Sequence, residues 1–308
     1  MKNFGRCIFA TLLLSTVLST SVLANKETNV ASLKQFEVAT WNVEHLAFPI
    51  NQGCRPRDAR EFNELKGYAN SLTADIIAFQ EVSSYEAVEN LFPSSDWQIF
   101  VSQRADTKSY DCRKSGFKST QQKVAFAVRK ALNVKQITTL DEFGIDNPGL
   151  RHGLELTVES SLGDITILNV HMKSGCFVDD FTKKDSRACK TLAKQVPVLD
   201  GWIEKKEKQG TPYIVLGDFN HRLSAKNNYL ADILKNNSDN SASTMQLTTQ
   251  DSVGCHPRYP APIDHIILGN VDPSSVNKKV VVYPYKNMDP KAMLSDHCAV
   301  SLSITPVK

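Results

Sequence analysis

Short apolar runs bounded by turn-forming residues recur along almost the whole chain. β-Branched and aromatic side chains dominate these runs, and Gly, Asp, Pro or Asn residues stand at their ends, as is typical of β-strands. The predicted strands span residues 36–41, 75–80, 97–101, 123–129, 154–158, 164–170, 213–217, 263–268, 279–283 and 298–304.

Three segments between the strands have the spacing of amphipathic helices. They span residues 58–72, 84–91 and 185–207, and the last gathers its apolar side chains on one face: Ala188, Leu192, Val196, Leu199 and Ile203. Strands 154–158 and 164–170 follow each other as a hairpin would, whereas helices separate other strands. This mixture predicts mixed sheets with helices on the outside. The polar stretches 103–122 and 236–252 are predicted surface loops.

The N-terminus has the layout of a secretory signal peptide. Lys2 and Arg6 precede an apolar run over residues 8–18, and small residues at 22–24 offer a cleavage site. The run is shorter than the ~20 residues of a membrane-spanning helix. We therefore expect residues 1–24 to be a signal peptide, and residues 25–308 to be a single domain because no repeat or composition break follows.

The charge balance of the predicted mature chain is nearly neutral. Loss of Lys2 and Arg6 reduces the 36 basic residues to 34, against 33 acidic ones. No global field therefore draws the protein to nucleic acid or membranes, and a basic footprint has to be local.

Six cysteines remain once Cys7 leaves with the signal peptide: Cys54, Cys112, Cys176, Cys189, Cys255 and Cys298. An even number in an exported chain indicates disulfides. Cys176 and Cys189 are closest in sequence and form the first bridge we expect, whereas spacing does not fix the other pairs. A zinc site is the alternative, since histidines adjoin Cys255 and Cys298, although CxxC spacing is lacking.

Polar side chains of a particular kind follow or precede six of the predicted strands. They mix carboxylate, carboxamide and imidazole: Asn42, Glu81, His171 with Lys173, Asp218 with Asn220, Asp264, and Asp296 with His297. Each has an ordinary explanation as a capping residue, but six separate capping events are a poor account of the whole set. Asp218 and Asn220 are two positions apart, so both are expected to face one site while Phe219 points into the core.

This mixture suits metal-assisted attack on a phosphate ester. Mg²⁺ prefers oxygen ligands such as those of Glu81 and Asp296, with waters and substrate completing its shell. An Asp–His pair can orient or deprotonate water, and a further His or Lys can stabilise the developing phosphate charge. Neither a GxSxG nor a GxxxxGK[ST] motif occurs, which disfavours acyl transfer and P-loop nucleotide binding.

Six motifs in order resemble those of the endonuclease/exonuclease/phosphatase superfamily, which has the DNase I-like fold. They are TWNVEHL (40–46), IIAFQEV (76–82), LNVHMKSG (168–175), IVLGDFNHR (214–222), IDHIIL (263–268) and LSDHCAV (294–300). The chain is similar to exported, bacterial-type members. The resemblance implies an α/β fold, a four-layer sandwich of two mixed sheets flanked by helices, with the site at the sheet edges.

The resemblance also implies a role for each matching position. Asn42, Glu81 and Asp296 correspond to metal-site residues, with Mg²⁺ as the expected ion and Mn²⁺ or Ca²⁺ as alternatives. The implied catalytic residues are His171, Asp218, Asn220, Asp264 and His297, of which Asp264 and His297 form the acid–imidazole pair. Arg151 and Lys173 are implied to contact phosphate.

The chain departs from DNase I-like nucleases at two points. Val82 stands where many nucleases have an arginine after the metal glutamate, and Gln122 is the loosely aligned counterpart of the glutamate that would pair with His171. Among the other histidines, His221 is expected to support the site or lie at the surface, with direct participation as the alternative, and His265 is expected to be structural. His45, His152 and His256 are expected at the rim or surface.

The basic residues between positions 113 and 130 favour a nucleic-acid substrate if they form a rim along a phosphate backbone. They are Arg113, Lys114, Lys118, Lys123, Arg129 and Lys130, with a weaker group at Arg55, Arg57 and Arg60. We expect a monomeric, periplasmic or secreted nuclease without stable membrane association. The alternatives are a phospholipid hydrolase, a phosphomonoester hydrolase and a non-catalytic binding protein. For the phospholipid hydrolase, Phe177, Val178 and Phe181 are the apolar residues nearest the site that could contact a bilayer.

Overall fold

The computed structural model describes residue 1, residues 35–113 and residues 116–307. Apart from Met1, the predicted signal peptide lies outside the described residues, as does Lys114. None of the helices in the described part of the chain is long and apolar enough to span a membrane.

The first of two six-stranded sheets has the strand order β11-β12-β1-β2-β4-β3 within the described residues. Its strands are β1 (Phe36–Leu46), β2 (Ile76–Val82), β3 (Trp97–Val101), β4 (Lys123–Arg129), β11 (Val276–Tyr283) and β12 (Ala299–Pro306). Strands β1 and β2 are parallel, and the other neighbours in this sheet are antiparallel.

The second sheet has the order β5-β6-β7-β8-β10-β9. Its strands are β5 (Val134–Leu140), β6 (Gly153–Ser160), β7 (Gly163–His171), β8 (Tyr213–Asp218), β9 (Gln246–Leu247) and β10 (Asp264–Gly269). Strands β7 and β8 are parallel, and the remaining pairs are antiparallel. Both sheets are therefore mixed, as the sequence predicts.

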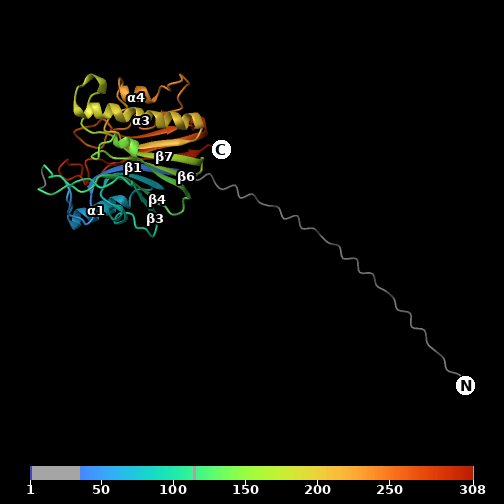
Figure 1. Cartoon of the computed structure of the whole chain (residues 1–308). Coiled ribbons are helices and arrows are strands. Elements are labelled where there is room, and N and C mark those ends of the chain that lie inside the picture. Colours follow the sequence, from blue (N-terminus) through green and yellow to red (C-terminus); the bar gives the residue numbers. More distant parts are fainter. Residues whose placement is uncertain (2–34, 114–115, 308) are drawn as a thin grey trace. The chain divides into compact units, whose positions relative to one another are not determined.

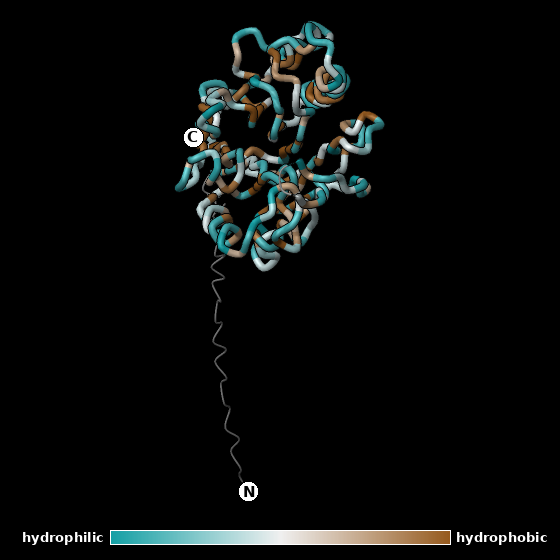
Figure 2. Tube along the Cα trace, turned by 90° about the vertical axis from the view of Figure 1, so that its left-hand side faces the viewer, coloured by the Kyte–Doolittle hydropathy of each residue, from teal (hydrophilic) through white to brown (hydrophobic). Residues whose placement is uncertain are grey.

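The two sheets pack face to face, and helices cover their outer faces (Figure 1). One apolar cluster lies between the sheets and contains inward-facing residues of both, such as Ile76 and Phe126 from the first and Ile167 and Ile214 from the second. Two further clusters pack helices against the outer faces. Hydrophilic positions predominate along the peripheral loops (Figure 2). The predicted four-layer α/β sandwich is confirmed.

Helices α1 (Ala59–Ala69) and α2 (Tyr85–Glu89) cover the first sheet, and α3 (Arg187–Gln209) and α4 (Tyr229–Leu234) cover the second. Short 3-10 helices span Asp141–Gly144, Phe181–Lys183 and Pro273–Ser275. Asp58 begins α1 with a capping box that Glu61 completes, and Ser186 caps α3, whose buried face includes Leu192, Val196 and Leu199. Side-chain caps of this kind satisfy the free N–H groups of the first helical turn.

A buried polar bridge joins the two sheets beneath the strand ends. The Gln80 side chain of β2 donates to Asn169 Oδ1 of β7 at 2.8 Å and to Thr40 Oγ1 at 3.1 Å. Asn169 Nδ2 in turn donates to the carbonyls of Phe79 and Ala125 in the first sheet. All three side chains are fully buried, so each bond satisfies a group that water cannot reach.

Besides the short 3-10 helices, three elements of the described chain were not predicted. Strand β5 is half exposed and polar, so it lacks the apolar run that identifies the other strands. Helix α4 has six residues, too few for a clear period. Strand β9 is a two-residue strand inside the stretch that we expected to be a loop over residues 236–252.

All six cysteines of the described chain form disulfides: Cys54–Cys112, Cys176–Cys189 and Cys255–Cys298. The expected bridge between Cys176 and Cys189 is confirmed. The zinc alternative is wrong, because Cys255 and Cys298 bond to each other.

Candidate active site

The predicted site residues converge on one edge of the sandwich. The carboxyl ends of the parallel strands β1 and β2 carry Asn42 and Glu81, and those of β7 and β8 carry His171 and Asp218. Strand β10 begins directly beside the end of β8, with Asp264 opposite Asp218. His297 comes from the segment that enters β12 next to β1. Parallel pairing thus brings residues far apart in sequence to the same edge.

Asp218 lies at the centre of this edge and is 1% exposed. Its Oδ2 accepts hydrogen bonds from Asn42 Nδ2 and Asn220 Nδ2, both at 3.0 Å, and its Oδ1 accepts from the Asn220 backbone N–H at 2.7 Å. Burial raises its pKa to about 7, against the opposing effect of His297. A carboxyl group with a pKa near neutrality is suited to proton transfer.

The backbone around Asp218 is constrained. Gly217 has φ +147°, and a Cβ there would lie 2.0 Å from the carbonyl oxygen of Val170 in β7, so only glycine permits this approach. Strand β8 ends at Asp218, and Asn220 has a left-handed φ of 50°. The expectation that strand register aligns Asp218 with Asn220 is therefore wrong. Their side chains nevertheless meet, and Phe219 is fully buried as expected.

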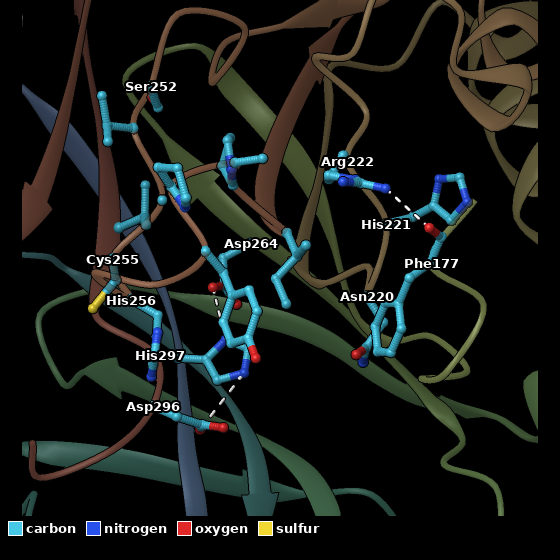
Figure 3. A pocket seen from close by; sticks show the side chains of 18 of the residues that line it. Phe177, Asn220, His221, Arg222, Ser252, Cys255, His256, Asp264, Asp296 and His297 are labelled. Atoms are coloured by element: carbon cyan, nitrogen blue, oxygen red, sulfur yellow. Dashed lines mark hydrogen bonds and ion pairs between the residues drawn. The ribbon is translucent and has the colours of Figure 1, made fainter. Parts of the chain in front are cut away.

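Asp264 and His297 form the expected acid–imidazole pair, with 2.8 Å between His297 Nδ1 and Asp264 Oδ2. His297 Nε2 points the other way and lies 3.8 Å from both Asp218 Oδ2 and Asp296 Oδ1 (Figure 3). Burial disfavours the charged imidazole, but Asp264 and Asp218 outweigh it and raise the pKa of His297 well above 6.5. His297 is therefore cationic at neutral pH and faces the site with Nε2.

Glu81 forms a second centre on the side of β2. Cationic or basic groups surround it: His45 Nε2 at 3.6 Å, Arg151 Nη2 at 3.8 Å and His171 Nε2 at 3.9 Å. Burial would raise the pKa of Glu81, but these three groups lower it to about 2. The carboxylate is thus fixed in its charged form.

The irregular last part of β1 adds two residues that were not predicted to belong to the site. Glu44 and His45 lie in an irregularity of the β1–β2 pairing, and both have left-handed φ angles, as does Glu81. Burial and Asp296 raise the pKa of Glu44 to about 7. Strained backbone of this kind concentrates at functional sites. The only sequence signal was their position beside Asn42.

The donor set fits a divalent cation that prefers oxygen. Asn42, Glu81 and Asp296, the predicted metal residues, lie at this edge with Glu44 between Asn42 and Asp296. A second set is tighter: ligand atoms of Asp218, Asp264 and His297 lie within 4.8 Å of one another. In that set Asp264 Oδ1 is buried and has no hydrogen-bond partner among the described residues. Hard carboxylate oxygens at both centres suit Mg²⁺, Mn²⁺ or Ca²⁺.

The remaining polar candidates divide between the site and its surroundings. Arg151 lies beside Glu81, and burial together with Arg151 lowers the pKa of Lys173. Gln122 belongs to this side too, but it bonds Arg151 Nη2 and His45 rather than His171. His171 Nδ1 has no hydrogen-bond partner in the described chain, so the pairing of Gln122 with His171 is wrong.

The other histidines occupy supporting positions. His265 is fully buried and bonds Thr249 and the backbone at 221 and 223, and burial lowers its pKa to about 4. His221 is buried behind Asn220 and bonds Asn228. His152 and His256 are partly exposed. His45 is not at the outer rim, as the contacts with Glu81 show.

The basic residues between 113 and 130 do not form a continuous rim in the described chain. Lys118 pairs with Asp111 and Lys123 with Asp106. Arg129 stacks on Trp97 at the end of β4 opposite the site. The group at 55–60 is also dispersed, because Arg57 is buried against the carbonyls of Val43 and Leu294, and Arg55 and Arg60 pair with acidic neighbours. The apolar group proposed for a lipid enzyme is likewise broken up, since Phe181 is buried against Tyr229.

Comparison with known proteins places the chain in a family. A model described as the endonuclease/exonuclease/phosphatase family matches residues 39–297, whereas no curated protein matches the chain in sequence. Among solved structures, an endonuclease/exonuclease/phosphatase from Bacteroides vulgatus has a TM-score of 0.58 at 16% identity, covering 89% of this chain and 100% of that one.

Two structures from animals show the same fold. TDP2 from D. rerio has a TM-score of 0.59 at 15% identity, covering 88% of this chain and 99% of its own. The catalytic domain of human Nocturnin has a TM-score of 0.59 at 12% identity, with 90% and 95% covered. The chain therefore belongs to the endonuclease/exonuclease/phosphatase family and is a hydrolase of the phosphoesterase type.

Proposed function

We propose that the protein is an exported, divalent-metal-dependent phosphodiesterase that cleaves nucleic acid. The observation that carries this proposal is the convergence, at one sheet edge, of the Asp264–His297 pair and Asp218 with the ionised Glu81. Three disulfides are compatible with export, because such bonds persist in oxidising compartments.

Each of these residues has a separate role in phosphodiester hydrolysis. Asp218 accepts a proton from the attacking water, which Asn220 helps to orient. Cationic His297, held by Asp264, stabilises charge on the phosphate and supplies a proton to the leaving oxygen. His171 is kept neutral, because burial and Arg151 lower its pKa well below 6.5, and it can donate through Nε2. A divalent cation held by Asn42, Glu81 and Asp296 would neutralise phosphoryl charge.

Nucleic acid is the substrate that we favour. Arg151 provides a cationic group beside Glu81, with Lys173 near Arg151, and phosphate contacts with such groups dominate nucleic-acid affinity. The D. rerio TDP2 structure is complexed with single strand DNA product, which makes nucleic acid the first substrate to test.

The test is hydrolysis of plasmid DNA, RNA, sphingomyelin vesicles and bis(p-nitrophenyl) phosphate with Mg²⁺, Mn²⁺ or EDTA. We expect cleavage of nucleic acid that EDTA abolishes and that His297→Ala or Asp264→Asn reduces by about 10²- to 10⁴-fold. The matched control is Asp232→Asn, which changes an exposed carboxylate on α4 and should leave activity intact.

Other outcomes point to other functions. Turnover of sphingomyelin or the small diester without cleavage of nucleic acid would keep the hydrolytic site and reject the nuclease. Activity that persists in EDTA would reject metal dependence. Inactivity on all four substrates would favour a non-catalytic binding protein.

A further inference from the structure

A cavity of about 760 Å³ opens beside the Asp264–His297 pair (Figure 3). Residues 176–178 and 220–222 line one wall, and the loop over residues 252–263 contributes to the other. Asn220, Asp264 and His297 form part of its surface. The volume lies in the ~300–1,000 Å³ range of small-molecule sites. A group bound here is therefore in contact with the catalytic residues.

Apart from Met1, the three most exposed large apolar side chains of the described chain line this cavity. Tyr259 is 70% exposed, Val253 67% and Phe177 63%, and all three line it. The next most exposed, Tyr110, is 53% exposed and lies elsewhere. Soluble proteins rarely concentrate exposed apolar side chains without a binding role. We therefore expect the cavity walls to bind a ligand that has a flat apolar face.

Covalent and hydrogen bonds hold both walls in place. Cys176, the neighbour of Phe177, bonds Cys189 at the start of α3. Cys255 bonds Cys298, the neighbour of His297, so this disulfide ties the 252–263 loop to the catalytic pair. Within that loop the Tyr259 N–H donates to the His256 carbonyl, and the two rings lie 5.0 Å apart. A preorganised aromatic wall loses little conformational freedom when a ligand binds.

Cationic groups accompany the aromatic ones. Arg222 lines the cavity, donates to the Phe177 backbone carbonyl at 3.0 Å and lies 3.7 Å from Asp179 Oδ1. Arg258 lines the cavity next to Tyr259. The walls therefore combine aromatic faces with positive charge, and this combination matches a ligand that has both an aromatic ring and phosphate.

We propose that this cavity binds an unpaired nucleobase next to the scissile phosphate, with Phe177 and Tyr259 as stacking platforms. The proposal rests on the nuclease function above and adds that the substrate is single-stranded nucleic acid. In a duplex the base faces are covered by their neighbours, whereas an unpaired base offers its face to an aromatic side chain. A membrane fits less well, because these side chains line a concave surface flanked by arginines.

The experiment compares wild type with the double variant Phe177→Ala/Tyr259→Ala. A labelled single-stranded oligonucleotide and the duplex of the same sequence are the substrates, and kcat/KM is measured for each. Stacking contributes ~1–3 kcal/mol per base, so we expect the double variant to lose about ten- to hundredfold on the single strand and to change little on the duplex. Tyr259→Phe, which keeps the ring, should retain activity, and Tyr110→Ala is the control for an exposed tyrosine elsewhere.

A binding measurement separates recognition from turnover. Fluorescence anisotropy of the same single strand in EDTA should show weaker binding to the double variant and unchanged binding to the Tyr110 control. A double variant that keeps both affinity and strand preference would overturn the proposal, as would an equal loss on single strand and duplex. If wild type cleaves neither nucleic acid but hydrolyses sphingomyelin vesicles, the nuclease function itself fails.

Discussion

Asp218 and Glu81 are both buried carboxylates, yet their surroundings move their pKa values in opposite directions. Asp218 receives hydrogen bonds mainly from neutral amides, so burial dominates and its pKa is about 7. Glu81 lies among His171, His45 and Arg151, which keep its pKa near 2. One carboxyl can therefore exchange a proton near neutral pH while the other remains an anion, which is the division that acid–base chemistry beside a cation requires.

A residue far from the site provides a test of the same physics. Burial, with a smaller effect of Glu204, raises the pKa of Asp200 on α3 to about 6. The folded state thus disfavours its charged form. Below the unfolded pKa of about 4 the group is neutral in both states and costs nothing. The cost grows as pH rises from about 4, where the unfolded state ionises, to about 6, and is complete above that pH.

Asp200→Asn should therefore stabilise the protein at pH 7.5 and leave it unchanged at pH 3.5. Because Asp200 is partly exposed, we expect about 1 kcal/mol or less. Urea unfolding at both pH values measures the difference, with the exposed Asp232→Asn as control. An equal stabilisation at both pH values would contradict the assignment.

At the scale of single residues, the sequence identified the site residues that stand at an end of an apolar strand. Asn42, Glu81, Asp218 and Asp264 are of this kind, and the structure brings them together. Glu44 and His45 were missed because their placement depends on left-handed backbone angles and on an irregularity of the strand pairing. The amino-acid types at these positions do not indicate either feature.

At the scale of elements, the polar bridge between β2 and β7 ties the strand that carries Glu81 to the strand that ends at His171. Gln80 precedes Glu81 directly, and Asn169 stands two residues before His171. Because the bridge is buried on all sides, its groups have no other partners to replace a missing one.

Asn169→Ala should destabilise the fold by roughly 2–5 kcal/mol, since it removes the side-chain partner of one Gln80 N–H and of two buried backbone carbonyls. Asn133→Ala is the control, because Asn133 is exposed and bonds only Glu159 in the described chain. Chemical denaturation measures both variants. A change below about 0.5 kcal/mol for Asn169→Ala, the usual size of the effect of a surface substitution, would show that water replaces the bridge.

Strand and helix prediction succeeded where burial imposes a period. The ten predicted strands and three predicted helices all occur within a few residues of their expected bounds. Strand β5 was missed because it lies at the edge of its sheet with largely polar side chains. Its pairing with β6, rather than its own composition, makes it a strand.

At the scale of the whole molecule, two of the disulfides hold the walls of the cavity, whereas Cys54–Cys112 joins two segments outside its lining. Removing Cys255–Cys298 as a pair of alanines should lower stability by about 2–4 kcal/mol. It should also reduce activity at temperatures at which the variant is still folded, because Cys298 adjoins His297. Removing Cys54–Cys112 should lower stability with less effect on activity.

Thermal unfolding and kcat/KM at 20 °C measure the two effects separately for both pairs. Equal activity in the two variants would contradict a role for Cys255–Cys298 in holding the catalytic pair. Reduction of the wild type should lower the Tm, and an unchanged Tm in reductant would count against structural disulfides altogether.

The two sheets follow the same plan of pairing: two antiparallel contacts, one parallel contact at the centre and two more antiparallel contacts. The molecule is thus approximately two-fold in its strand arrangement, although its sequence has no repeat. Each half supplies one central parallel pair, with Glu81 from one and Asp218 from the other. A slight rotation of one sheet against the other would leave each half intact and still separate these carboxylates, so catalytic geometry depends on the alignment of the halves.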